Sequence, residues 1–87
     1  MNLKIKEWDD RQTEQEDIVR FYDQEIQAAI SREKADLGKR GILNASYEEL
    51  RTYLTQKRKQ EDDRLEQIKS ERRVWWKSVT DHLHVDE

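Results

Sequence analysis

Residues 38–49 read GKRGILNASYEE, and this stretch decides the fold because it is the one clear interruption in an otherwise uniform chain. It holds both glycines of the sequence, Gly38 and Gly41, and proline is absent throughout. Gly38 is placed to end one helix, while Ser46 and Glu49 have the spacing of a capping box that begins another. The stretch therefore predicts two helices joined by a turn at residues 38–45.

Upstream of the turn, residues 9–37 have the pattern of a first helix. Asp9 and Asp10 are suitable caps, and Thr13 with Glu16 fits a capping box. Apolar residues then recur at helical steps of four, four and three at Ile18, Tyr22, Ile26 and Ala29. Leu37 continues this stripe, with Phe21 and Ile30 beside it. Residues 1–8, MNLKIKEW, are expected to form a short flexible or extended arm.

Downstream, residues 46–83 predict a second helix, with no breaker inside it and a tail at residues 84–87. The middle of this helix is polar, because Lys57, Arg58 and Glu61 occupy positions where the apolar stripe should continue. On either side of this interruption the stripe consists of Tyr47, Leu50, Leu54, Leu65, Ile68, Trp75, Val79 and Leu83.

Folding the chain back about residue 42 predicts a long antiparallel two-helix hairpin, an all-α fold of the coiled-coil kind. Leu37 then faces Tyr47, and Trp8 lies opposite Trp75 and Trp76. The helices would be roughly 42 and 57 Å long, at about 1.5 Å per residue. A hairpin with one thin and interrupted stripe cannot close a core by itself. We therefore expect self-association, or a partner protein, to complete the core.

The composition bounds the class of protein. The 87 residues are enough for one domain, and only 33% are hydrophobic, against about 45–50% in ordinary soluble domains. Disorder is disfavoured because 17 basic residues nearly balance 20 acidic ones. Cysteine is absent, and no apolar run exceeds three residues, so neither a disulfide framework nor a membrane span is expected. The prediction is a cytoplasmic protein without a signal peptide at its start.

The segment ERRVWWKSVTDHL, residues 71–83, carries two adjacent tryptophans in an otherwise polar helix. Neighbouring helical residues point about 100° apart, so Trp75 faces the stripe while Trp76 flanks it. One interpretation is a terminal core cluster closed by Trp8; the other is an anchor for a partner protein, a role in which tryptophan is enriched. A membrane-interface helix is the third, disfavoured by Asp81 and by the acidic tail. The candidate partner-binding residues are Trp8, Arg72, Trp75, Trp76, Val79 and Leu83.

Charge is distributed unevenly and suggests an alternative. Residues 38–60 carry six basic and two acidic groups, whereas both flanking regions are acidic. A homodimeric helical bundle could use this block to contact phosphates. In the hairpin, however, the block lies opposite Asp23 and Glu25, and the chain has a net charge of −3. The candidate nucleic-acid-binding residues are Lys39, Arg40, Arg51, Lys57, Arg58 and Lys59.

Nothing in the sequence predicts catalysis. His82 and His84 are two residues apart, which on a helix points them to nearly opposite sides, so they make a poor ligand pair. Phosphate-binding loops and nucleophile motifs are absent. We expect a non-catalytic protein without cofactor, metal or small-molecule substrate: a small accessory, assembly or inhibitory subunit that docks on a larger protein. Salt separates this from the alternative, since phosphate binding weakens steeply with salt and apolar docking hardly does.

Overall fold

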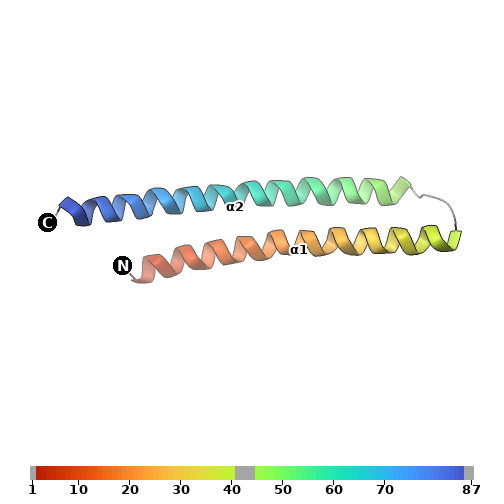
Figure 1. Cartoon of the computed structure of the whole chain (residues 1–87), viewed down its shortest axis with the longest axis horizontal. Helices are drawn as coiled ribbons and strands as arrows, with labels where there is room; N and C mark the ends of the chain where they lie inside the picture. Colours follow the sequence, from red (N-terminus) through yellow and green to blue (C-terminus); the bar gives the residue numbers. More distant parts are fainter. Residues whose placement is uncertain (1, 41–44, 86–87) are drawn as a thin grey trace.

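Two long helices packed side by side make up the computed structural model of this chain (Figure 1). Helix α1 spans Asn2–Arg40 and helix α2 spans Ala45–Val85. The structure describes the backbone of residues 2–40 and 45–85, and the side chains of residues 3–37 and 46–81. The hairpin measures 71 × 17 × 13 Å, with both termini at one end. The all-α antiparallel hairpin is therefore confirmed.

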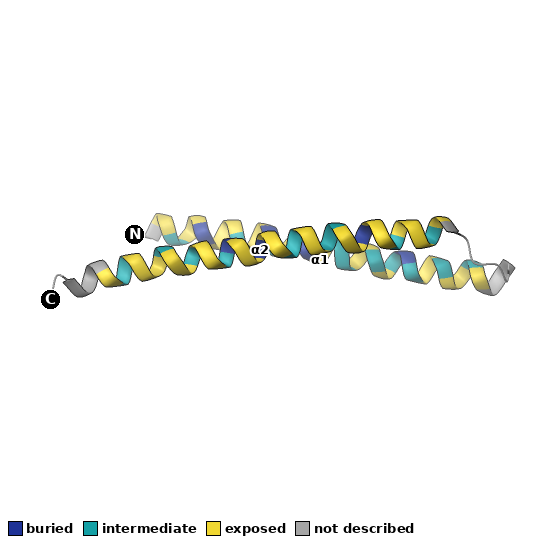
Figure 2. Ribbon diagram, turned by 90° about the horizontal axis from the view of Figure 1, so that it is seen from above, coloured by how far each residue is buried: buried dark blue, intermediate teal, exposed yellow. Residues whose placement is uncertain are grey.

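The helices meet along a seam of alternating three- and four-residue steps, and they cross at a shallow angle (Figure 2). This is the spacing of a coiled coil. Every seam residue is buried or half-buried. On α1 the seam consists of Trp8, Gln12, Gln15, Val19, Tyr22, Ile26, Ala29, Glu33 and Asp36; on α2 it consists of Tyr47, Arg51, Leu54, Arg58, Glu61, Leu65, Ile68, Arg72, Trp75 and Val79.

Polar side chains fill the seam where apolar ones are missing, and they pair across the two helices. Gln15 Nε2 donates to the backbone oxygen and to Oε2 of Glu61, both at 2.7 Å. Arg51 Nε lies 2.8 Å from Glu33 Oε2, and the Tyr47 hydroxyl donates to Asp36. Within the interruption that the sequence predicted in the middle of α2, Glu61 thus pairs with Gln15 and Arg58 pairs with Asp23 across the two helices.

The expected N-terminal arm is wrong for residues 2–8, because α1 begins at Asn2. Trp8 is only 7% exposed and packs against α2. Lys4 Nζ lies 3.5 Å from Glu7 Oε2, an i,i+3 pair on the first turns. Packing of an apolar face is what stabilises most helices in proteins, and here the buried indole extends α1 past the predicted cap at Asp9.

Two further expectations need correction. Gly38 does not end the first helix, since α1 continues to Arg40. The predicted stripe on α1 was also displaced by one position near its start: Ile18 is 39% exposed, whereas Val19 is buried. Leu37 and Leu50 likewise flank the seam, at 40% and 39% exposed.

The second helix begins one residue before the predicted cap, Ser46. Residues 41–44 of the predicted turn lie outside the described residues.

Candidate functional site

Three indole rings gather at the open end of the hairpin. The Trp8 and Trp75 centroids are 6.1 Å apart, and those of Trp75 and Trp76 are 5.9 Å apart. The Arg11 guanidinium carbon lies 4.6 Å from the centre of the Trp8 ring. Trp8 Nε1 is buried without an acceptor among the described residues. Ring packing and the cation–ring contact, rather than a hydrogen bond of this indole, are therefore the contacts that the cluster shows.

Exposure separates the roles of the three tryptophans. Trp8 is buried and Trp75 half-buried, so both belong to the core of the hairpin. Trp76 keeps 50% of its surface exposed. Trp8 and Trp75 thus close the open end of the hairpin, and Trp76 is presented to the outside.

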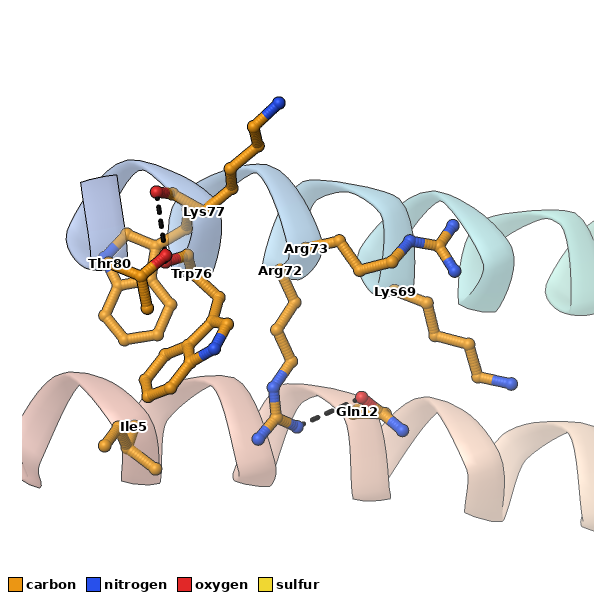
Figure 3. A pocket seen from close by; sticks show the side chains of 9 residues that line it. Ile5, Gln12, Lys69, Arg72, Arg73, Trp76, Lys77 and Thr80 are labelled. Carbon is orange, nitrogen blue, oxygen red and sulfur yellow. Dashed lines mark hydrogen bonds between the residues drawn. The ribbon is translucent and has the colours of Figure 1, made fainter. Parts of the chain in front are cut away.

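Trp76 borders an open groove of about 640 Å³ that runs between the helix ends (Figure 3). Helix α1 contributes Ile5 and Gln12, and α2 supplies the remaining side chains. The Lys77 side chain extends away from α1, which places its ammonium group at the outer rim. The groove is lined by Ile5, Gln12, Lys69, Arg72, Arg73, Trp75, Trp76, Lys77 and Thr80.

Four cations line this groove, and two of them are neutralised. Arg72 Nη2 donates to Asp9 Oδ1 at 2.6 Å, and its Nη1 donates to Gln12 Oε1 at 3.1 Å. Lys69 Nζ lies 3.6 Å from Glu66 Oε1. Within the described part of the chain, Arg73 and Lys77 have no carboxylate partner. The groove is therefore positive at one wall, on a chain that is acidic overall.

The structure brings together only part of the predicted partner-binding set. Arg72, Trp75 and Trp76 line the groove, while Trp8 is buried in the core and does not line it. Val79 is half-buried in the seam, and the Leu83 side chain lies outside the described residues.

Sequence reasoning did not assign the partner-binding role to six residues that line the groove as well, namely Ile5, Gln12, Lys69, Arg73, Lys77 and Thr80. Ile5 was missed because its segment was taken for an arm. The sequence could have pointed to Lys69, Arg73 and Lys77. Their spacing of four residues places them on one side of a helix, near Trp76.

The basic block of residues 38–60 is partly neutralised inside the hairpin. Arg51 pairs with Glu33, and Arg58 donates two hydrogen bonds to Asp23. The hydrogen bond to Asp23, and then the attraction of its charge, raise the pKa of Arg58 above its ordinary value. Lys57 Nζ lies 5.8 Å from the centre of the Tyr53 ring. The side chains of Lys39 and Arg40 lie outside the described residues, so nucleic-acid binding stays a prediction.

The described residues include no group of three or more His, Cys, Asp or Glu side chains arranged to hold a metal ion. Over residues 2–40 and 45–85, neither helix has an apolar stretch long enough to cross a bilayer. The side chains of His82 and His84 lie outside the described residues.

The sequence and structure were compared with known proteins. No protein-family model and no curated protein matches the sequence, and no solved structure matches the fold closely enough to count as similar.

Proposed function

We propose that this chain is a non-catalytic protein-interaction module, a small accessory, assembly or inhibitory subunit that docks on a protein surface through the Trp76 groove. The observation that carries the proposal is the contrast among the three tryptophans. Trp8 and Trp75 pack in the core of the hairpin, whereas Trp76 is half exposed at a groove of about 640 Å³. An exposed indole supported from beneath is typical of an interface anchor.

The surface of the whole chain supports the same proposal. The hairpin exposes 7024 Å², whereas a compact monomer of its mass exposes about 5,500 Å². A standard protein interface buries about 800 Å² on each partner. The excess surface is thus large enough for a protein to cover.

A non-catalytic role is part of the proposal. The hairpin is only 17 and 13 Å across in its two short directions, and its groove is open along the side (Figure 3). Such a shape gives little means of excluding water from a reacting group, and water exclusion is what makes electrostatic catalysis effective. A cytosolic setting remains the prediction from the sequence.

A nuclease-treated pull-down from the native source tests the proposal. Wild-type protein is compared with Trp76→Ser and with Val74→Ser, which removes another exposed apolar residue, 68% exposed, that does not line the groove. We expect a protein band that wild type and Val74→Ser retain and Trp76→Ser loses. Trp75→Ser is unsuitable, since it would remove a ring that packs against Trp8.

Circular dichroism first establishes that all three proteins are equally helical. A partner band retained by Trp76→Ser would contradict the proposal, because docking would then not depend on the groove. Loss of the band from Val74→Ser as well would also contradict it, because docking would then not be specific to the groove.

A further inference from the structure

A second exposed apolar feature lies on α1 and takes no part in the hairpin core. Phe21 is 53% exposed and Ile18 is 39% exposed. The Phe21 ring meets Tyr22 edge to face, with centroids 5.3 Å apart. Asp17 and Glu25 lie one helical turn before and after Phe21. We call Asp17, Ile18, Phe21 and Glu25 the acidic ridge.

The groove has the complementary arrangement. Lys69, Arg73 and Lys77 follow one another at steps of four residues along α2, or about 6 Å per step. Asp17, Phe21 and Glu25 repeat at the same step. The two carboxylates of the ridge therefore match Lys69 and Lys77 in spacing and oppose them in sign.

The apolar parts match as well, because Ile5, Trp75 and Trp76 give the groove an apolar portion. Asp17 and Lys69 do have partners on their own helices, Arg20 at 3.2 Å and Glu66 at 3.6 Å. Exposed i,i+3 pairs of this kind contribute little and exchange readily, so they do not block a contact with another molecule.

The ridge and the groove lie on opposite sides of the hairpin. Arg11 Nη2 approaches Glu71 Oε2 at 3.7 Å and marks one side. Ile18 follows Arg11 by seven residues, two helical turns, and so lies on that side. Glu71 does not line the groove, and it stands about 200° around α2 from Lys69, which does. One molecule can therefore use both surfaces at once.

We propose that the groove of one molecule receives the acidic ridge of a second copy of this chain. This inference rests on the proposed function, since it names the occupant of the same groove. Phe21 of one copy packs on Trp76 and Ile5 of the next, and the two carboxylates approach Lys69 and Lys77. The incoming α1 supplies the third helix that a two-helix hairpin lacks. Because the two surfaces differ, the contact is head-to-tail and continues from copy to copy.

Sedimentation of the purified 87-residue chain tests this inference. Wild type is expected to form species larger than dimers as concentration rises towards about 1 mM. Phe21→Ser and Trp76→Ser each remove one anchor, so each alone should weaken association about thirtyfold or more. An equimolar mixture of the two variants should form a one-to-one dimer and nothing larger, since the mixture holds one intact ridge and one intact groove per pair.

Exposed residues outside the two surfaces provide matched controls. Tyr53→Ser removes an aromatic ring as exposed as Phe21, at 54%, and Val74→Ser removes an exposed apolar side chain near Trp76 on α2. Both should assemble like wild type. A charge exchange adds a readout that leaves the rings intact: Asp17→Lys with Glu25→Lys should abolish assembly, and Lys69→Glu with Lys77→Glu in the same chain should restore it.

Three results would overturn the inference: a wild type that stays monomeric over the whole range, a mixture of the two serine variants that does not dimerise, or a serine variant that assembles like wild type. The test is separate from that of the proposed function. A monomeric wild type that still captures a different protein through Trp76 would leave the proposed function standing and remove the second copy as the occupant.

Discussion

Gln15 is the one polar residue among the buried side chains that the structure describes, at 5% exposed. Its amide nitrogen bridges the backbone oxygen and the carboxylate of Glu61, whose side chain is only 18% exposed. Arg64 lies 3.8 Å from the same carboxylate, but two-thirds of its own side chain is exposed. The Gln15 amide is therefore the main neutral donor that keeps this acidic group inside the seam.

Replacing Gln15 with leucine should lower the free energy of unfolding by about 1–3 kcal/mol, because the Glu61 carboxylate would lose a buried donor. The double change Gln15→Leu, Glu61→Leu should recover most of that loss, since replacing both partners by apolar groups is often neutral or stabilising. Urea unfolding followed by circular dichroism, with Glu61→Leu alone completing the cycle, measures the coupling. A double variant as unstable as Gln15→Leu would show that the carboxylate is not what the amide stabilises.

At the scale of the elements, charged pairs across the seam hold the two helices in register. Arg51 pairs with Glu33, Arg58 with Asp23 and Arg72 with Asp9. Each is partly exposed and contributes about 0.2–1 kcal/mol. Asp23 raises the pKa of Arg58, so this stabilisation is fully present below the unfolded-state pKa and is lost only as pH rises through the higher folded-state pKa. The pair is therefore unaffected by pH changes around neutrality.

The continuation of α1 through Gly38 gives a prediction for that helix. Within a helix, glycine is less favourable than alanine by about 0.5–1 kcal/mol. Gly38→Ala should therefore raise the free energy of unfolding by up to that amount, measured by thermal and urea unfolding. A glycine in the left-handed conformation of a helix cap would respond in the opposite way. Destabilisation by Gly38→Ala would thus support the cap that the sequence predicted and contradict a helix that runs to Arg40.

At the scale of the whole molecule, the hairpin is long and thin and has little interior. Six hydrophobic residues are buried among those described, namely Trp8, Val19, Ala29, Leu54, Leu65 and Ile68. None of the described side chains has an exposure below 2%. Small domains bury a modest share of their surface, and this one buries less than its mass would allow. Its free energy of unfolding as a monomer should fall below the usual range of about 5–15 kcal/mol.

Because the second copy binds only the folded hairpin, stability should rise with protein concentration. Mass action adds about 2.7 kcal/mol when the free partner is at a hundred times the dissociation constant. Thermal unfolding of wild type from about 5 to 500 μM should therefore show an increasing midpoint, whereas Trp76→Ser should show a constant one. A wild-type midpoint that does not change with concentration would mean that the hairpin is stable without a second copy.

The sequence by itself determined the hairpin. One glycine-containing turn, one capping box and the absence of proline are local signals, and they were enough to place the second helix within one residue of its start at Ala45. The length of the chain on either side of the turn also placed Trp8 opposite Trp75, as the structure shows. These features depend on backbone preferences and on counting residues, which do not require knowledge of the packed state.

Only the tertiary structure decided which α1 residues share the seam and which polar side chains fill it. Neighbouring helical residues differ by about 100° in direction, so one position separates buried Val19 from exposed Ile18. Apolar residues alone could not settle that register, because 43% of the chain is charged and polar residues occupy much of the seam. A buried Gln15 is favourable only when Glu61, 46 residues away, meets it, and that meeting exists only once the helices have packed.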